Sequence, residues 1–262
     1  MIDAAYAAEG AEHGGGAAGG LPNPMHQFEI KRLIPFELFG FDASFTNSAL
    51  FMLIAATLIT LFTVYAMHSR ALVPSRLQSV AELSYQFIAN MVRDNVGTDG
   101  MKYFPFVFTL FMFVLTLNML GMVPYSFTVT SHIIVTFALA AFIFLGVTLI
   151  GFWKHGAQFL KFFVPEGVPI VMLPLLVVIE VISYLTRPLS LSVRLFANMM
   201  AGHTVLAVFG GFVVALGILA GWMPLAFIVA MIGLELIIAI LQAYVFAILT
   251  CIYLNDAFHV HH

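Results

Sequence analysis

Charged residues are scarce in this chain. Ten Lys and Arg and thirteen Asp and Glu side chains make up 9% of the 262 residues, whereas hydrophobic residues make up 62%. Soluble domains carry about a quarter charged residues, so this composition excludes an ordinary soluble globule, a disordered chain and a coiled coil. It predicts instead that lipid is the solvent. The net charge of −3 gives no attraction to nucleic acid.

Cysteine and nucleotide-binding motifs are also lacking. The single cysteine, Cys251, excludes an internal disulfide and a cysteine-based metal cluster. No phosphate-cradling loop of the form GxxxxGK[ST] occurs, so ATP chemistry must lie elsewhere. No catalytic residue, cofactor or metal site is predicted. Residues 1–20 are rich in Ala and Gly. They lack the basic start and apolar core of a signal peptide and are predicted to form a flexible tail.

Long apolar runs predict an all-α polytopic membrane protein, with residues 21–262 as a single membrane domain. The first run, from Thr46 to Met67, has no charge and is long enough to cross a core of about 30 Å at about 1.5 Å per residue. Residues 21–45, which hold three prolines and five charges, read as an ordered or interfacial segment. About five membrane helices are expected, at 46–67, 105–123, 133–153, 169–217 and 224–256.

Two of the expected helices differ from simple spans. Residues 74–95, beginning at Pro74, repeat apolar side chains at helical spacing and predict an amphipathic helix at the membrane surface or on the bundle. Residues 169–217 would make a straight helix of about 73 Å. Either they form two spans broken at Pro188 or they form one strongly tilted helix. We favour a long tilted hairpin with 224–256, turning between Gly217 and Pro224.

The distribution of Lys and Arg predicts the orientation. The segments 68–104 and 154–168 hold basic residues, whereas turn 124–132 holds no Lys or Arg. The positive-inside rule therefore places the two basic segments, and the C-terminus, in the cytoplasm or mitochondrial matrix, and the N-terminus outside.

Ionisable residues interrupt the last two apolar runs. Glu180, Arg187 and Arg194 are spaced by seven and form one helical stripe, which Asn198 extends. His203 points away from that stripe. A charge at mid-membrane costs at least about 2.5–3.5 kcal/mol, so such residues face water, a partner charge or a functional path. The plain alternative is an Arg–Glu pair that holds the bundle together.

An antiparallel hairpin would place these residues at matching depths. An almost constant register of the two helices would bring Arg194 level with Gln242, His203 level with Glu235, and Glu180 level with Asp256. His and carboxylates can titrate near neutral pH in a suitable environment, whereas Arg cannot lose its proton. Two titratable clusters separated by a fixed positive charge would form two half-paths for protons without a short circuit.

Three segments closely resemble subunit a of the rotary F-type ATP synthase. They are Arg187-Pro-Leu-Ser-Leu-Ser-Val-Arg194-Leu-Phe-Ala-Asn198-Met-Met-Ala-Gly-His203, the run Leu241-Gln242-Ala-Tyr-Val-Phe with Glu235 seven residues before Gln242, and Asn118-Met-Leu-Gly-Met-Val-Pro-Tyr-Ser-Phe. The resemblance covers about residues 40–262, and its order of His and Glu is similar to the mitochondrial and alphaproteobacterial type.

The resemblance implies a role for each matching residue. Arg194 matches the essential arginine that faces the subunit c carboxylates, and Asn198 and Gln242 match polar residues beside it. His203 and Glu235 match the outer half-channel. The remaining matches are Glu180 and Ser190 in the inner half-channel, and Arg187, Asp256 and Tyr244 as secondary candidates.

The same resemblance implies a non-catalytic stator subunit of the proton channel in the CF(0) sector. Its partners would be the c-ring, the peripheral stalk subunit b, other ATP synthase subunits and the lipid bilayer, in a bacterial or mitochondrial inner membrane. Two alternatives are a self-contained transporter or channel and a structural membrane anchor. Transporters often contain two related halves, and no such repeat is found in this sequence.

Overall fold

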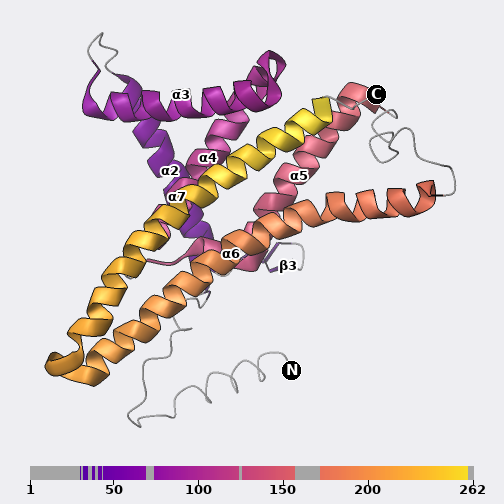
Figure 1. Cartoon of the computed structure of the whole chain (residues 1–262). Helices are drawn as coiled ribbons and strands as arrows, with labels where there is room; N and C mark the ends of the chain where they lie inside the picture. Colours follow the sequence, from indigo (N-terminus) through magenta and orange to yellow (C-terminus); the bar gives the residue numbers. More distant parts are fainter. Residues whose placement is uncertain are drawn as a thin grey trace.

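The chain folds as a set of long helices in the computed structural model (Figure 1). The structure describes residues 30, 32–34, 37–38, 41–42, 44–68, 74–123, 126–156 and 172–258. The predicted tail at 1–20 and most of the basic segment 154–168 lie outside these residues. The helices are α2 (Asn47–His68), α3 (Arg76–Val96), η2 (Thr98–Tyr103), α4 (Phe104–Gly121), η3 (Val129–Ser131), α5 (Ile133–His155), α6 (Leu173–Ala220) and α7 (Trp222–Phe258).

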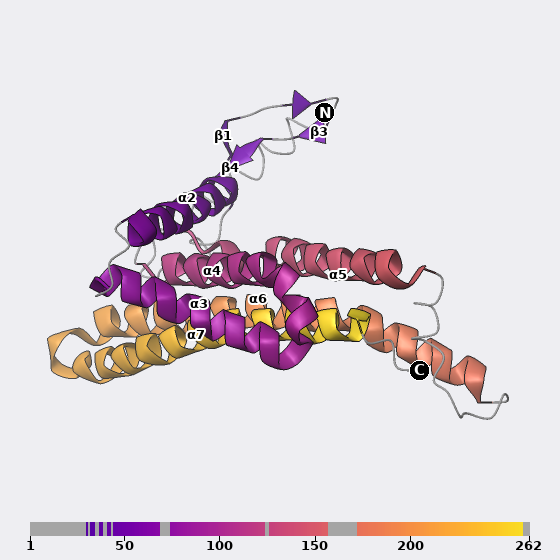
Figure 2. The same ribbon diagram turned by 90° about the horizontal axis from the view of Figure 1, so that it is seen from above.

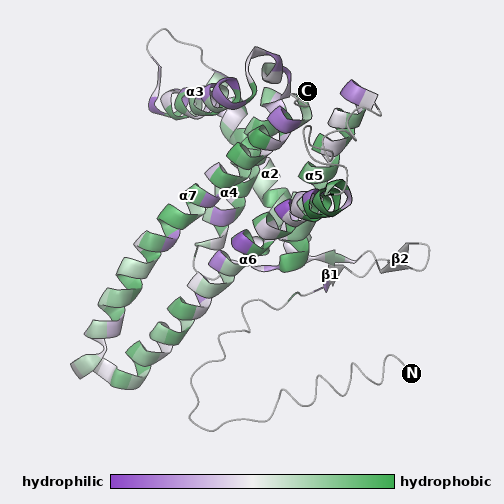
Figure 3. Ribbon diagram, turned by 45° about the vertical axis from the view of Figure 1, so that its right-hand side comes forward, coloured by the Kyte–Doolittle hydropathy of each residue, from purple (hydrophilic) through white to green (hydrophobic). Residues whose placement is uncertain are grey.

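Five of these helical segments are long and apolar enough to cross a membrane: Asn47–His68, Thr98–Gly121, Ile133–His155, Leu173–Gly217 and Trp222–Phe258. Figure 3 shows hydrophobic residues along most of each of these helices, interrupted by hydrophilic positions on α6 and α7. Many large apolar side chains are exposed along them, as expected where the solvent is lipid. The prediction of an all-α polytopic membrane protein is confirmed.

The amphipathic helix α3 lies across the bundle rather than along it. Its N-cap is Ser75, whose hydroxyl accepts a hydrogen bond from the backbone N–H of Gln78 at 3.3 Å. The expectation that Pro74 is the first helical residue is therefore wrong, because the hydroxyl of Ser75 caps the free backbone N–H of Gln78 and the helix starts at Arg76. Gly97, with φ 82°, ends the helix.

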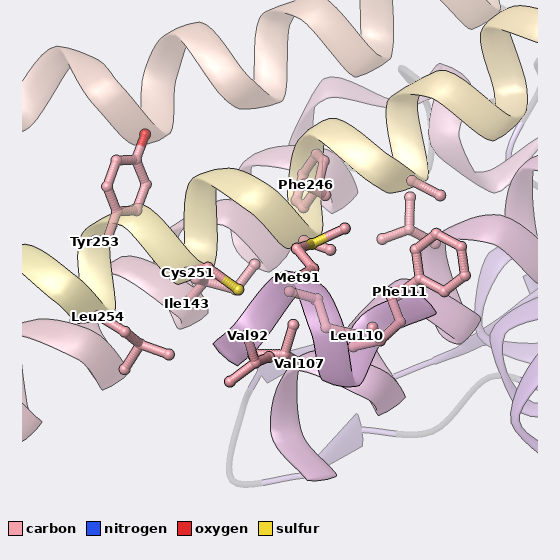
Figure 4. Close-up of a cluster of buried hydrophobic side chains, with 14 of the residues drawn as sticks. Met91, Val92, Val107, Leu110, Phe111, Ile143, Phe246, Cys251, Tyr253 and Leu254 are labelled. Carbon is pink, nitrogen blue, oxygen red and sulfur yellow. The ribbon is translucent and has the colours of Figure 1, made fainter. Parts of the chain in front are cut away.

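The membrane helices form two layers. In Figure 2, α4 and α5 lie over α6 and α7, α3 crosses the bundle, and α2 lies to one side. A hydrophobic core joins α3, α4, α5 and α7, including Val92, Val107, Ile143 and Phe246 (Figure 4). The C-terminal half of α7 is packed in this core, which positions Gln242 and Glu235, two of the buried polar residues that α7 carries.

The last two helices form the predicted hairpin. Helix α6 continues through Pro188, so the alternative of one long helix holds, although the proline leaves the carbonyl of Tyr184 without its helical donor. The turn begins at Gly217, which has φ 60° and ψ −159°, a conformation that favours glycine. In Figure 1 the two helices are side by side at this turn and diverge toward the other end.

Short strands precede α2. Strand β1 (Arg32–Ile34) pairs antiparallel with β4 (Phe45–Thr46), and β2 (Glu37–Leu38) pairs antiparallel with β3 (Phe41–Asp42). The sequence gives no strand signal of useful length here. These pairs nevertheless order part of the segment that was expected to be ordered or interfacial.

Candidate functional site

A buried contact joins three helices in the half of the hairpin nearer its turn. Nδ1 of His203 on α6 lies 2.5 Å from Oε1 of Glu235 on α7. Nε2 of the same ring lies 2.9 Å from the carbonyl oxygen of Gly121 at the end of α4. The side chains are 11% and 5% exposed, respectively. The prediction that the hairpin brings His203 to Glu235 is confirmed.

The hydrogen bonds of His203 constrain its protonation. The carbonyl oxygen of Gly121 can only accept, so Nε2–H of His203 donates to it. Nδ1 then faces a carboxylate oxygen at 2.5 Å, a separation at which two lone pairs would repel. One proton therefore lies between them, either on the imidazole or on the carboxyl group. The pair is neutral as a unit and can hold or release this proton.

Gly202 provides the space that Glu235 needs. A Cβ atom at Gly202 would lie 2.7 Å from Oε1 and 3.1 Å from Cδ of Glu235. Any side chain at this position would therefore displace the carboxyl group. A second close approach occurs at Gly121, where an added Cβ would lie 2.8 Å from Cγ2 of Thr128. The hydroxyl of Thr128 also donates to the carbonyl oxygen of Gly121, at 3.3 Å.

Two buried side-chain amides belong to α4 and α7. Nδ2 of Asn118, on α4, donates to the carbonyl oxygen of Ala239 at 3.2 Å and so ties α4 to α7. Oδ1 of Asn118 and Oε1 of Gln242 are buried without a hydrogen-bond partner among the described residues. Such oxygens are costly to leave unpaired. Gln242 is therefore a polar group in the core rather than part of the exposed face.

Arg194 lies near the middle of α6 on an exposed face. Ser190, Ala197 and Ala201 share this face and are also exposed, whereas Leu191, Leu195 and Met199 are buried on the opposite side. Within the described part of the chain, Arg194 has no carboxylate within salt-bridge distance. A permanent charge thus lies on an open, small-residue surface inside a helix that can span the membrane.

Asn198 is partly buried one turn after Arg194, as predicted for the stripe. Glu180 is partly buried near the other end of α6. Tyr244 is also partly buried, and its ring lies 5.8 Å from that of Phe87 on α3. Among the described residues, no hydrogen bond or ion pair joins Glu180, Ser190, Gln242 or Tyr244 to Arg194, so their grouping stays a prediction.

A second charged pair connects the diverging ends of α6 and α7. Nη1 of Arg187 donates to Oδ2 of Asp256 at 2.8 Å. The two side chains are 27% and 31% exposed, respectively. The guanidinium also lies over the rings of Tyr184 and Tyr253, at 5.8 and 5.5 Å. The hydroxyls of Tyr184 and Thr148 lie 2.7 Å apart, which links the cluster to α5.

This pair corrects the predicted register. Asp256 was expected level with Glu180, but the residue it contacts is Arg187, about two helical turns closer to the hairpin turn. A constant register assumes parallel axes, whereas α6 and α7 separate toward this end. The long Arg187 side chain spans the wider gap.

One histidine outside the membrane helices has a perturbed environment. His132 precedes α5 and stacks on Phe127, with ring centroids 5.0 Å apart. Burial lowers the pKa of His132 below its usual 6.5. Its Nε2 is buried and has no hydrogen-bond partner among the described residues. His132 is thus favoured in the neutral form. Within the same described ranges, no group of three or more His, Cys, Asp and Glu residues could hold a metal ion.

Comparison with known proteins decides the family. The family model for the ATP synthase A chain matches residues 49–255, which run from the first turn of α2 to the last turn of α7. The chain belongs to this ATP synthase A chain family. It is 61% identical over 241 residues to ATP synthase subunit a of Pelagibacter ubique, covering 92% of this chain and 99% of that protein.

Other relatives are similar in sequence to this chain over almost their whole length. ATP synthase subunit a of Chelativorans sp. is 61% identical over 246 residues, covering 92% of this chain and 99% of the relative. That of Parvibaculum lavamentivorans is 58% identical over 263 residues, covering 97% and 100%. The predicted family is confirmed. Membership of the ATP synthase A chain family, together with the five apolar helices, identifies an integral membrane protein.

Sequence reasoning missed several residues of the site. Gly202 acts through its lack of a side chain and Gly121 through its backbone carbonyl, so neither gave a side-chain signal. Thr128 acts through a hydroxyl that donates to the carbonyl oxygen of Gly121. The position of Gly202 directly before His203 was the available hint. The pairing of Arg187 with Asp256 was also missed, although both residues were candidates.

Proposed function

We propose that this chain is the stator subunit of the ATP synthase proton channel, and that Arg194 couples proton translocation to rotation of the c-ring. The single observation that carries the proposal is the exposed Arg194 on α6. An unpaired charge at this depth is costly, so an anion from a partner must meet it in the complex. Ser190, Ala197 and Ala201 leave the backbone accessible to a neighbouring helix, which supports a ring carboxylate as that anion.

The pair His203–Glu235 supports the outer half-channel. It is buried, and it holds one proton that either partner can carry. In the proposed cycle a proton passes from this pair to a c-ring carboxylate, which becomes neutral and can move through lipid. Arg194 cannot accept this proton. It therefore separates the outer path from the inner one.

The inner half-channel is proposed near Glu180 and Ser190, on the other side of Arg194 along α6. The carboxylate releases its proton there after almost a full turn, and Arg194 attracts the newly formed charge. A potential of 100 mV contributes about 2.3 kcal/mol per proton, so several protons are needed for each ATP. Asn198 and Gln242 tune the polarity around Arg194 in this proposal, and the chain itself performs no ATP chemistry.

The proposed partners are the c-ring, the peripheral stalk subunit b and the remaining ATP synthase subunits. The relatives named above are bacterial, which supports a bacterial inner membrane. A self-contained transporter or channel would have to supply its own counter-ion for Arg194, and the described part of the chain provides none. Co-purification with a small two-helix proteolipid would distinguish a stator subunit from a self-contained transporter or channel.

The essential test replaces Arg194 with Ala in the assembled complex. The expected result is normal assembly with ATP-driven proton pumping abolished, measured as acidification of inverted vesicles. Arg187→Ala is the matched control, because it removes the same charge on the same helix from a position that already has a protein partner. Normal pumping by assembled Arg194→Ala complexes would remove the residue from this role.

The proposed orientation places the N-terminus outside and the C-terminus inside. A membrane-impermeant thiol reagent is expected to label a cysteine introduced at Gly15 in intact cells and to miss one at His261. The native Cys251 is buried and gives little background. The opposite labelling pattern would overturn the orientation.

A further inference from the structure

A pocket of about 340 Å³ lies at one end of the helix bundle, away from the residues discussed above. It is lined by Asp99, Lys102, Tyr103, Ile150, Trp153, Lys154 and Phe258. These residues come from η2, the last turns of α5 and the last residue of α7. Three separate parts of the chain therefore build one hollow.

The pocket lies where membrane spans end together. The spans Thr98–Gly121, Ile133–His155 and Trp222–Phe258 each have one end at this pocket. In Figure 1 the ends of α5 and α7 are near one another at this side of the bundle. Trp153 is 86% exposed, and exposed tryptophans in membrane proteins concentrate at the headgroup level. The hollow is therefore at the membrane border.

The charge of the pocket is positive. The lining carries two lysines, Lys102 and Lys154, and one carboxylate, Asp99, and all three residues are exposed. Among the described residues neither lysine has a salt-bridge partner. The ammonium of Lys154 lies 4.1 Å from the ring centroid of Phe258, and that ring packs on Tyr103 at 5.3 Å. The aromatic pair thus holds one cation in the wall while its N–H donors stay available.

We propose that this pocket binds the phosphate of an anionic phospholipid headgroup. The two ammonium groups would hold the phosphate as charge-assisted hydrogen-bond donors, and Ile150, Trp153 and the aromatic pair would contact the upper acyl chain. A basic pocket between membrane helices is suited to such headgroups. The apolar half of the lining favours a lipid over free phosphate. In the proposed orientation the lipid belongs to the cytoplasmic leaflet.

The chain provides its own probe for a test. Its only tryptophans are Trp153, in the pocket, and Trp222, at the hairpin turn. The full chain carrying Trp222→Phe is placed in phosphatidylcholine nanodiscs, and brominated phosphatidylglycerol or brominated phosphatidylcholine is titrated in. Bromine quenches a tryptophan that it contacts. Half-quenching is expected at about fivefold less phosphatidylglycerol, the equivalent of about 1 kcal/mol for the net positive charge.

Matched variants assign the preference to the pocket. Lys102→Gln with Lys154→Gln should remove the fivefold difference, whereas Lys102→Arg with Lys154→Arg should keep it. Arg93→Gln, an exposed basic side chain at the end of α3 that does not line the pocket, should also keep it. The chain with Trp153→Phe, which reports from Trp222, should show no preference.

Two results would overturn the proposal. Equal quenching of Trp153 by the two brominated lipids would mean that the pocket does not select a headgroup. Loss of the preference on adding inorganic phosphate at constant ionic strength would mean that the site takes free phosphate rather than lipid. If the double Gln variant fails to fold by circular dichroism, the comparison of the two brominated lipids between the Trp222→Phe and Trp153→Phe chains still decides. The measurement needs no rotation or ATP synthesis, so it fails or succeeds independently of the proposed function.

Discussion

The same two helices carry two charged contacts of opposite character. Near the hairpin turn, His203 and Glu235 are almost fully buried and share one proton. Toward the diverging ends, Arg187 and Asp256 are partly exposed, and Arg187 keeps its charge at every physiological pH. The first contact can change its proton content, whereas the second is a fixed ion pair.

This difference separates proton handling from positioning. A buried His–carboxylate pair alters its net charge when it loses its proton, so it can pass a proton onward. An ion pair that contains arginine cannot do so, and its stacking with Tyr184 and Tyr253 adds rigidity instead. In the proposed function, transport therefore belongs to the former and helix spacing to the latter. Three sets of substitutions test this division, beginning with the largest expected effect.

His203→Gln and Glu235→Gln should each slow proton flux by about tenfold or more, because each removes one of the two groups that hold the shared proton. The double variant should be little worse than either single variant, since both defects block the same step. Passive proton flux through reconstituted complexes measures this, with assembly checked by native gel. Wild-type flux in both single variants from about pH 6 to about pH 8 would exclude this pair from the path.

Gly202→Ala should reduce flux less than those changes but clearly. The new Cβ would lie 2.7 Å from Oε1 of Glu235, so the carboxyl group must move and the short contact to His203 must lengthen. Gly210→Ala on α6 and Gly233→Ala on α7 are matched controls, because a Cβ at either position meets no atom within 4 Å. The same flux assay applies. Equal behaviour of all three variants would contradict the proposed positioning role of Gly202.

Asp256→Asn should have the smallest effect. Partly exposed ion pairs contribute about 1 kcal/mol or less, so thermal stability of the complex should fall slightly while proton flux stays close to wild type. Light scattering on heating would measure the first and the vesicle assay the second. A loss of flux as large as that of Glu235→Gln would show that the Arg187–Asp256 pair takes part in transport, and would contradict its role in helix spacing alone.

Much of the fold was predictable from the sequence, because lipid imposes long apolar helices with few exceptions. The 22 residues of α2 and the 23 of α5 follow directly from uncharged runs. The path of α6 through Pro188 was left open, since a proline permits both a break and a bend. Strands of two or three residues before α2 leave too short a pattern to detect.

The site was predictable where the two hairpin helices run side by side, and not where it depends on their divergence or on a backbone carbonyl. The level positions of His203 and Glu235 followed from an antiparallel hairpin. The contact from Arg187 to Asp256 did not, because α7 also packs against α3, α4 and α5, and the spacing of residues in one hairpin contains no information on that packing. Likewise, no pattern indicates that a carbonyl at Gly121 will meet His203.

The hydrogen bond from His203 to Gly121 restricts how the imidazole can work. A histidine that relays protons by flipping its ring must free both nitrogens in turn, but here Nε2 is tied to the end of α4. In the proposed proton path, the ring therefore keeps one orientation and exchanges its proton with Glu235 through Nδ1. The second carboxylate oxygen of Glu235, Oε2, would connect the pair to water and to the next carrier, so that the carboxyl group rather than the imidazole rotates.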